Sequence, residues 1–197
     1  MSGMCSPSFI LASASPRRRE LLRSIGLDFR IIPAHVDEKY LAGESPAQHV
    51  RRLSTIKAMA VAQKYQKAWV LGADTIVVID ETILGKPKNK AQAKNMLKKL
   101  SGREHKVFTG VTIAHMTLNI YEKKVVQSTV RFKTISTEEM NWYTACDEPY
   151  DKAGGYAVQG KGAIFIKSIR GSYSNVIGLP LCEVVELLKK YDVMTLD

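Results

Sequence analysis

The chain has 197 residues, 45% of them hydrophobic and 24% charged, an ordinary composition for one globular domain in two lobes. It has no apolar run long enough to span a bilayer, and its three scattered cysteines exclude a disulfide framework and suit a reducing cytoplasm. The formal net charge of +10 favours polyanionic partners such as nucleotides or nucleic acids, without choosing between them. Residues 1–7 lack the features of a signal peptide, and we expect them to be a flexible N-terminus.

The first predicted elements are a strand at Phe9–Ala12 and a helix that begins at Pro16. Ser15 is a suitable N-cap residue, and proline suits the first helical turn. Arg17–Arg19 lie in that turn, where free N–H groups and the helix dipole already favour an anion. Two interpretations stay open here, a cradle for a phosphate chain and a solvated basic turn.

A short strand at Phe29–Ile32, a polar loop from His35 and a helix follow. Ser45–Gln48 has the capping-box pattern with proline at the first helical position, and this helix is expected to reach about Tyr65.

The remaining elements alternate between strands and helices. Trp69–Leu71 and Ile76–Ile79 are strand-like runs on either side of Gly72–Thr75, and a turn at Asp80–Glu81 leads back to Gly85–Pro87. Next come a helix at Asn89–Ser101, paired strands at Lys106–Met116 and Lys123–Ile135, a helix from the Ser136–Glu139 capping box, a glycine-rich loop, a strand at Ala163–Ile169, a turn at Arg170–Gly171 and a helix at Leu181–Tyr191. Hairpins and crossover helices together predict an α/β fold with a mixed β-sheet flanked by helices.

Three charged residues lie where a plain core would not place them. Asp74 interrupts the apolar stretch Trp69–Ile79, so its carboxylate needs a cation, a metal or several donors, unless it is a turn aspartate bound to local backbone. Lys57 lies on the inward stripe of its predicted helix, where it points into a cleft or extends to the rim. Lys86 sits in a rigid turn before a proline, where alone it would be a surface lysine.

The loop Asp147–Gly162 is dense in turn residues and charges. Gly155–Lys161 matches P-loop spacing, but Gly162 replaces the magnesium-binding hydroxyl and a strand-like run follows, so we reject a P-loop. The loop is either purely structural or presents the Gln159 amide, which has both a donor and an acceptor, to a nucleobase edge.

Two further groups of polar residues have weaker patterns. The four histidines show no metal-ligand spacing, which predicts surface or structural roles. Asp37 and Glu38 form a carboxylate pair in a loop, which is either a solvated cap or a source of oxygen ligands for a hard cation such as Mg²⁺.

An ordered set of motifs resembles the Maf family of nucleoside triphosphate pyrophosphatases. The set comprises residues Ser13–Arg18, Val36–Glu38, Lys57–Ala58, Gly72–Thr75, Gly85–Pro87, Leu100–Gly102 and Asp151–Gly160. The arginine pair after Pro16, the Ala73–Thr75 string and Gln159 resemble the branch that hydrolyses dTTP and UTP. The sister branch that acts on 7-methyl-GTP has a tryptophan after the proline, which this chain lacks.

The resemblance implies a fold, a reaction and roles for particular residues. The fold would be similar to Maf and inosine triphosphate pyrophosphatase proteins, with two lobes around a central cleft. Water would attack the α-phosphate, with Asp74 as proton acceptor and with Glu38 and Asp74 binding Mg²⁺ or Mn²⁺. A free aspartate, with a pKa of roughly 3.9, is a weak base, and a divalent metal cation compensates by acidifying the water. The implied triphosphate contacts come from Ser13, Arg17, Arg18, Lys57 and Lys86, and the implied base contacts from Arg17, Thr75 and Gln159.

The resemblance also implies a cytoplasmic homodimer that cleans nucleotide pools, acts on dTTP, UTP or modified pyrimidine nucleotides, and is linked to inhibition of septum formation. The alternative that stays open is a non-catalytic nucleic-acid- or nucleotide-binding regulatory protein, which the net charge of +10 and the arginine cluster motivate. Sparse aromatics and the lack of a helix-turn-helix or zinc module argue against nucleic acid as a partner.

Overall fold

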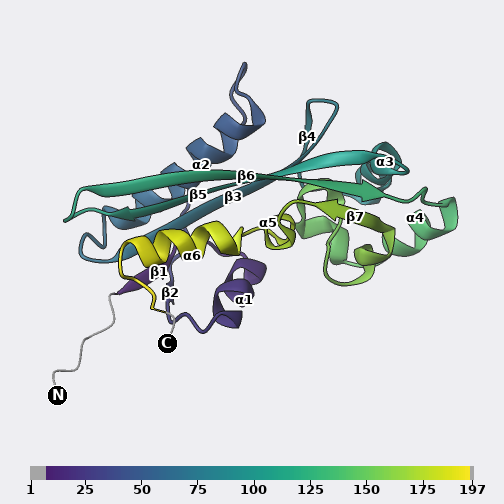
Figure 1. Cartoon of the computed structure of the whole chain (residues 1–197). Helices are drawn as coiled ribbons and strands as arrows, with labels where there is room; N and C mark the ends of the chain where they lie inside the picture. The colour runs from purple at the N-terminus through teal and green to yellow at the C-terminus, as the bar shows by residue number, and fades with distance from the viewer. Residues whose placement is uncertain (1–7, 196–197) are drawn as a thin grey trace. The chain divides into compact units, whose positions relative to one another are not determined.

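The computed structural model describes residues 8–195, which form a seven-stranded mixed β-sheet with helices packed against it (Figure 1). The strand order is β2-β1-β3-β5-β6-β7, and β4 pairs with β3. The strands are β1 (Phe9–Leu11), β2 (Arg30–Ile31), β3 (Trp69–Ile79), β4 (Thr82–Leu84), β5 (Glu104–His115), β6 (Ile120–Phe132) and β7 (Ile166–Arg170). The predicted fold class is confirmed.

Six α-helices and three short 3₁₀ helices lie in the described part of the chain. The α-helices are α1 (Pro16–Ser24), α2 (Pro46–Ala62), α3 (Lys90–Leu100), α4 (Thr137–Tyr143), α5 (Tyr173–Ile177) and α6 (Leu181–Lys190), and the 3₁₀ helices are η1 (Glu148–Asp151), η2 (Ala153–Gly155) and η3 (Lys161–Phe165). No helix within residues 8–195 is both long and apolar enough to cross a membrane.

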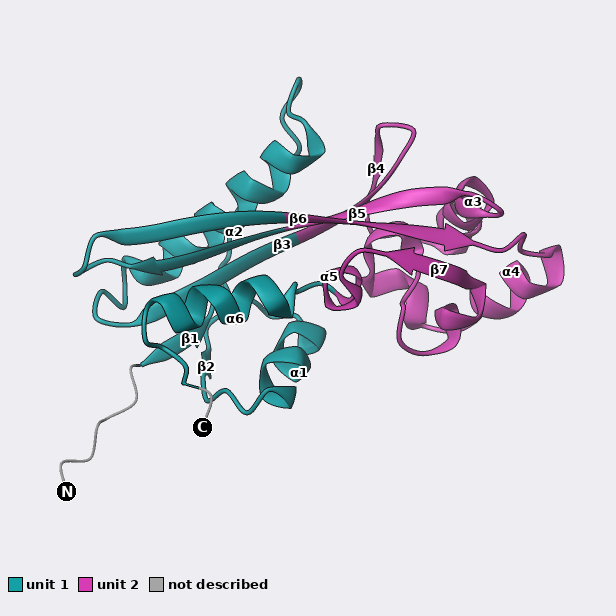
Figure 2. Ribbon diagram, viewed as in Figure 1, with its two compact units in different colours: residues 1–74, 110–125, 178–197 teal, residues 75–109, 126–177 magenta. Residues whose placement is uncertain are grey.

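The chain divides into two compact units (Figure 2). The first unit comprises the described residues up to Asp74, the segment Gly110–Val125 and the described residues from Gly178 onward. The second unit comprises Thr75–Thr109 and Val126–Ile177. The expected flexible N-terminus, residues 1–7, lies outside the described residues.

The first unit has helices on both faces of its part of the sheet. Successive side chains of a strand point to opposite faces, so neighbouring residues of β1 join different cores. Leu11 packs in one cluster with Leu22 of α1 and Leu187 of α6, whereas Ile10 packs in another with Ala58 of α2. Helices α1 and α6 therefore cover one face, and α2 covers the other.

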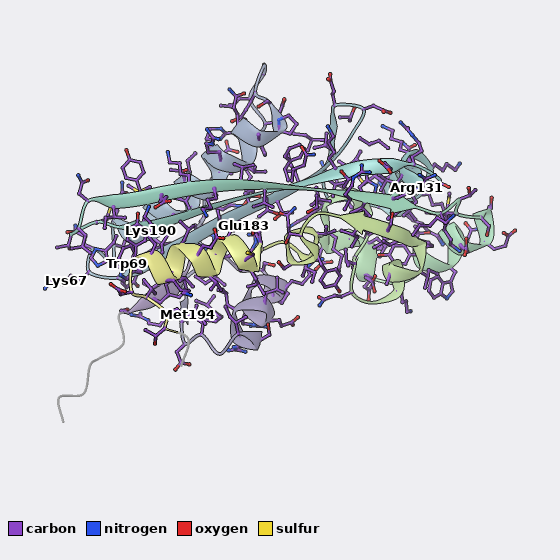
Figure 3. All side chains as sticks on the ribbon, in the orientation of Figure 1. Lys67, Trp69, Arg131, Glu183, Lys190 and Met194 are labelled. Carbon is purple, nitrogen blue, oxygen red and sulfur yellow. The ribbon has the colours of Figure 1, made fainter. Side chains whose placement is uncertain are left out.

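An aromatic cluster closes one end of the first core. Trp69 and Met194, both labelled in Figure 3, belong to the cluster that α1 and α6 cover. The Trp69 ring stacks on Tyr191 with 4.9 Å between ring centroids and meets His115 edge-on at 4.9 Å. This packing anchors the start of β3, the strand that carries Asp74.

The second unit is built around a β-hairpin and a β-ribbon. Asp80 and Glu81, with φ of 46° and 60°, form the predicted turn between β3 and β4. Strands β6 and β7 pair antiparallel, with a bulge at Arg131–Phe132. Phe132 packs with Leu97 of α3 in the core of this unit.

Most helix-capping predictions are confirmed. Both capping boxes, at Ser45 and Ser136, have their two reciprocal hydrogen bonds, and the Asn89 side chain caps α3 through the Gln92 amide. The exception is Ser15, which is the N-cap residue of α1 but makes no side-chain cap hydrogen bond. Its amide instead donates to the Ser13 hydroxyl, so that hydroxyl supports the entry to the helix.

Several element boundaries differ from the prediction. Trp69–Ile79 is one continuous strand, so Asp74 is not a turn residue. A strand from Ala163 is wrong, because Lys161–Phe165 is a 3₁₀ helix and β7 starts only at Ile166. Helix α2 ends at Ala62, before the predicted Tyr65, and the short helix α5 had no counterpart in the sequence pattern.

Candidate active site

Arg18 is the buried centre of the arginine-rich motif. It is the third residue of α1 and is only 8% exposed. Its Nε donates to the Gly178 carbonyl at 2.9 Å, and its Nη1 donates to Ser13 Oγ at 3.1 Å and to the Ala73 carbonyl at 2.8 Å. The guanidinium therefore links α1 to the loop after β1 and to β3, directly beside Asp74.

The charge environment of Arg18 is balanced by carboxylates. Burial lowers the pKa of Arg18, while the negative charges of Asp74 and Glu38 act in the opposite direction. Arginine nevertheless stays protonated in proteins. Arg18 thus supplies a fixed positive charge inside the first unit, whereas Arg17, in the same turn, is half-buried.

Lys57 joins two carboxylates from different segments. Its Nζ lies 2.8 Å from Asp74 Oδ1 and 2.7 Å from Glu38 Oε1. The side chains of Lys57 and Asp74 are 9% and 8% exposed, and that of Glu38 is 57% exposed. Lys57 therefore does not extend to the rim: α2 directs it inward, and Asp74 has the cation that its position in β3 requires.

The carboxylates of Glu38 and Asp74 are suited to a divalent metal ion. Each uses one oxygen on Lys57, so each carboxylate has a second oxygen. Hard carboxylate oxygens suit Mg²⁺ and Mn²⁺, and Mg²⁺ in particular is commonly bound by one or two carboxylates together with substrate phosphates. Within residues 8–195 there is no cluster of three or more potential protein ligands, so these two residues would have to share the ion with substrate and water.

The predicted carboxylate pair Asp37 and Glu38 is divided by the structure. Asp37 accepts a hydrogen bond from the Lys39 amide at 3.1 Å and pairs with the Lys39 ammonium at 3.1 Å. Glu38 instead reaches Lys57. Both interpretations of the pair hold in part: Asp37 makes a local solvated contact, and Glu38 joins the buried charges.

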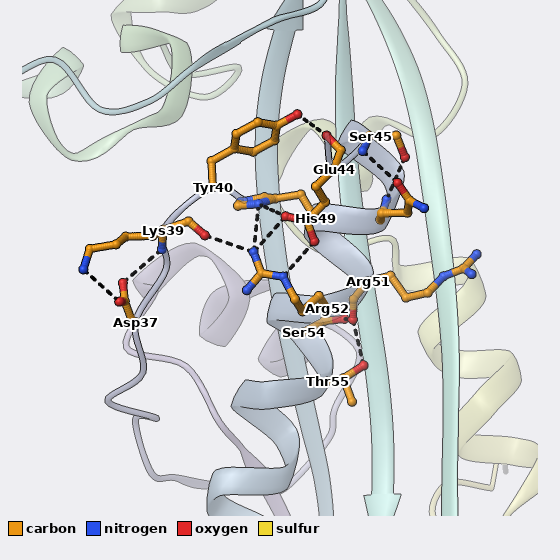
Figure 4. A network of polar contacts seen from close by, with 11 residues as sticks. Asp37, Lys39, Tyr40, Glu44, Ser45, His49, Arg51, Arg52, Ser54 and Thr55 are labelled. Carbon is orange, nitrogen blue, oxygen red and sulfur yellow. Dashed lines mark hydrogen bonds and ion pairs between the residues drawn. The ribbon is translucent and has the colours of Figure 1, made fainter. Parts of the chain in front are cut away.

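The loop that carries Glu38 is anchored to α2 by a network that the sequence analysis missed (Figure 4). Arg52 donates from Nε and Nη2 to the two oxygens of Glu44 at 2.7 and 2.8 Å, and from Nη2 to the Lys39 carbonyl at 3.0 Å. His49 contacts Glu44 at 3.1 Å. The Arg52 hydrogen bond, followed by that of His49, lowers the pKa of Glu44 to about 2. The sequence pattern that could have predicted this network is Glu44, which lies directly before the capping box and eight residues before Arg52.

Three predicted site residues belong to the second unit. Thr75 directly follows Asp74, and its Oγ1 lies 2.9 Å from Thr109 Oγ1. Lys86 is exposed after β4, and Gln159 is exposed in the loop before η3. The Gly154 amide donates to the Gly85 carbonyl at 3.0 Å, which ties this loop to the turn that carries Lys86.

Two further groups of predicted residues can be placed in the structure. The P-loop-like stretch is followed by the 3₁₀ helix η3 and not by the expected strand-like run, and the Gly162 amide donates to Glu148 at 2.8 Å. Three histidines have structural contacts: His49 with Glu44, His105 with Tyr156 at 2.6 Å, and His115 with the Leu118 amide.

Comparison with known proteins places the chain in a family. The model of the family described as Maf-like protein matches residues 8–191. The chain is 54% identical over 192 residues to a dTTP/UTP pyrophosphatase of Syntrophus aciditrophicus (strain SB), covering 98% of this chain and 94% of that protein. It is 46% identical over 187 residues to a dTTP/UTP pyrophosphatase of Clostridioides difficile (strain 630), covering 93% and 95%. The Staphylococcus aureus Ham1 protein structure aligns with a TM-score of 0.44 and 19% identity, covering 66% of this chain and 72% of that one. With a family match over nearly its whole length and relatives near half identity, the chain belongs to the Maf family.

Proposed function

We propose that this chain hydrolyses dTTP and UTP to the nucleoside monophosphate and pyrophosphate. Its relatives from Syntrophus aciditrophicus and Clostridioides difficile are named dTTP/UTP pyrophosphatases. The observation that carries the proposal is the buried Asp74 carboxylate, held by Lys57 next to the Glu38 carboxylate. Such a group of fixed charges is suited to hydrolysis of an anionic phosphoanhydride.

In the proposed reaction, a water oxygen forms a bond to the α-phosphorus as the bond to the bridging oxygen breaks and pyrophosphate leaves. Asp74 accepts the proton of the water, and its position in β3 limits its motion. Glu38 and Asp74 would hold Mg²⁺ or Mn²⁺, which would supply neutralisation of phosphate charge and a more acidic water. Lys57 orients both carboxylates.

The remaining roles follow the chemistry of each side chain. Arg18 uses Nε and Nη1 on protein acceptors, which favours a role in holding the Ser13 hydroxyl and the strand before Asp74. Ser13, Arg17 and Lys86 then bind the triphosphate, where cations and hydrogen-bond donors stabilise developing charge. Arg17, Thr75 and Gln159 select the base.

The proposed enzyme acts in the cytoplasm as a house-cleaning enzyme of nucleotide pools and forms a homodimer. The free thiols of Cys146 and Cys182 are what a protein of the reducing cytoplasm is expected to have. Light scattering on the purified protein measures the oligomeric state directly, and a monomer mass would contradict the dimer.

Product analysis tests the proposed reaction. Purified protein is incubated with dTTP, UTP, CTP and 7-methyl-GTP plus Mg²⁺ or Mn²⁺, and pyrophosphate is resolved from orthophosphate. We expect pyrophosphate from dTTP and UTP, and a rate loss of about 10²–10⁴-fold in Asp74→Asn, as for removal of a general base. No pyrophosphate from any nucleotide would favour the non-catalytic binding protein instead.

Asp80→Asn is the matched control for that substitution. Asp80 is an exposed turn residue with φ of 46° that pairs with Arg103, and asparagine tolerates this backbone conformation. We expect Asp80→Asn to have the rate of the wild type. If Asp74→Asn also has that rate, Asp74 has no role in the mechanism.

A further inference from the structure

Glu148, at the start of η1, binds the backbone of the loop that carries Gln159. Its Oε1 accepts hydrogen bonds from the Tyr143 hydroxyl at 2.9 Å and from the Gly162 amide at 2.8 Å. Its Oε2 accepts one from the Lys161 amide at 2.9 Å. One carboxylate thereby fixes the two backbone amides that follow Gln159 and Gly160.

Tyr143 fixes the same loop on the other side of Gln159. Its ring is fully buried in the core of the second unit, where it packs edge-on against Phe165 with 5.1 Å between ring centroids. Its hydroxyl accepts a hydrogen bond from the Ala157 amide at 3.2 Å while donating to Glu148. Burial, followed by the Glu148 hydrogen bond, raises the pKa of Tyr143, so the hydroxyl stays a donor throughout the working pH range.

The backbone between these anchors is fitted closely to the carboxylate. Gly160 has φ of +96°, and a Cβ atom there would lie 2.5 Å from Glu148 Oε2. A side chain at residue 160 would therefore meet both a strained backbone and the carboxylate. The loop can pass this close to Glu148 only as glycine.

Gln159 depends on these anchors for its position. Its side chain is exposed and makes no hydrogen bond to any other residue in the described part of the chain, so the backbone alone sets where the side chain starts and how far its amide reaches. An amide that reads a base edge must present its donor and acceptor in a fixed order, because a rotated amide exchanges them. Fixing the loop in advance also removes the entropy cost of ordering it on binding.

We propose that Tyr143 and Glu148 form a clamp that positions Gln159 for selection of the nucleobase. Neither residue touches substrate; both act through the backbone from Ala157 to Gly162. The inference rests on the proposed function, in which Gln159 contacts the base. The clamp predicts that specificity depends on two residues of the second core that themselves bind no nucleotide.

Two substitutions loosen the clamp by one hydrogen bond or more while keeping side-chain shape. Tyr143→Phe removes the hydroxyl, and Glu148→Gln replaces one of two accepting oxygens with a donor. We expect KM for UTP and dTTP to rise about tenfold in each variant, with kcat within about twofold, because a hydrogen bond to a charged group is worth roughly that factor. We also expect the preference for UTP over CTP to decrease in each variant. Asp147→Asn, the same charge change at the preceding exposed residue, leaves KM unchanged.

Combining each substitution with Gln159→Ala separates positioning from general damage to the fold. If the clamp acts through Gln159, Glu148→Gln has no further effect on KM in the Gln159→Ala background. Full additivity would overturn the proposal, as would unchanged KM and specificity in both clamp variants. Unchanged specificity in Gln159→Ala alone would overturn the role of Gln159 and the clamp with it, while hydrolysis of dTTP and UTP would stand.

Amide hydrogen exchange tests the clamp without substrate. The Lys161 and Gly162 amides are expected to exchange about tenfold faster in Glu148→Gln than in the wild type or in Asp147→Asn. Unchanged exchange would contradict the clamp. A wild type that releases no pyrophosphate would instead contradict the proposed function, and the exchange measurement would still decide whether Glu148 holds the loop.

Discussion

Lys57 is the residue on which the arrangement of the first unit most depends. It is the ammonium partner of both Asp74 and Glu38, and it lies on the buried face of α2 with Leu53 and Val61. Removing one partner of a buried ion pair is costly because the other charge is left in a low-dielectric environment. The exposed Glu38 can return to water, whereas Asp74 cannot.

Replacing Lys57 by methionine tests this asymmetry. We expect Lys57→Met to lower the free energy of unfolding by about 3 kcal/mol, the low end for breaking a buried pair, since Glu38 is half-exposed. Adding Asp74→Asn should restore part of that loss, because the unpaired charge disappears. Urea denaturation of the single and double variants measures both effects, with the exposed Lys64→Met as control. A double variant no more stable than Lys57→Met would contradict the explanation.

His105 gives the chain a defined sensitivity to acid. Its ring is 2% exposed, its Nε2 lies 2.6 Å from the Tyr156 hydroxyl, and burial lowers its pKa to about 4. The unfolded chain therefore takes up a proton near the ordinary histidine pKa of about 6.5, while the folded chain does not. Stability from this group is complete above that pH and is lost as the pH falls toward 4.

Histidine substitution isolates that contribution. The wild type should lose up to about 3 kcal/mol of unfolding free energy between pH 6.5 and 4 through His105, from a pKa difference of roughly 2.5 units. His105→Gln should lack this part of the loss, although it starts from a lower stability. Parallel slopes of stability against pH in the two proteins would contradict a neutral buried His105.

At the scale of elements, the contact between β3 and α2 sets the position of Asp74. A Cβ atom on Gly72 would lie 2.3 Å from the Ser54 carbonyl and 2.5 Å from the Ala58 amide. Gly110 of β5 approaches the same helix, with a Cβ that would lie 2.2 Å from the Val50 carbonyl. Two glycines on neighbouring strands therefore let α2 lie close enough for Lys57 to reach Asp74.

Gly72→Ala should separate these elements. The methyl group clashes with two backbone atoms, so we expect a loss of at least about 2–3 kcal/mol of stability, the upper range for overpacking, and a loss of activity from the displaced Lys57. Gly85→Ala has open space around its Cβ and serves as the control. Thermal unfolding together with pyrophosphate release measures both outcomes, and a Gly72→Ala variant as stable as Gly85→Ala would refute the close-contact explanation.

At the scale of the whole molecule, the net charge of +10 makes weak attraction to any polyanion unavoidable. Such attraction is long-range and screened by salt, with a Debye length of about 8 Å at physiological ionic strength. The buried site charges are screened much less. Non-specific binding and nucleotide hydrolysis should therefore respond differently to salt.

Binding to duplex DNA tests the alternative function at this scale. We expect a dissociation constant of about 10⁻⁶ M or higher at physiological salt, as for non-specific binding. The affinity should decrease steeply as the salt concentration increases. Fluorescence anisotropy with labelled duplexes of different sequence measures it, and UTP turnover in the same buffers is the comparison. Sequence-selective binding near 10⁻⁸ M would favour the regulatory alternative.

The sequence by itself determined the α/β class and most helix starts, which follow from local rules: capping residues and period-2 and period-3.6 patterns. It also marked Asp74 and Lys57 as charges inside apolar patterns, whereas their grouping with Glu38 is what the resemblance to the Maf family implies. Only the tertiary structure decided which carboxylates Lys57 pairs with, that Asp74 lies within a continuous strand, and that Glu148 holds the Gln159 loop. These contacts join residues far apart in the chain, and local propensity contains no information about which distant partner a charge or an open amide will find.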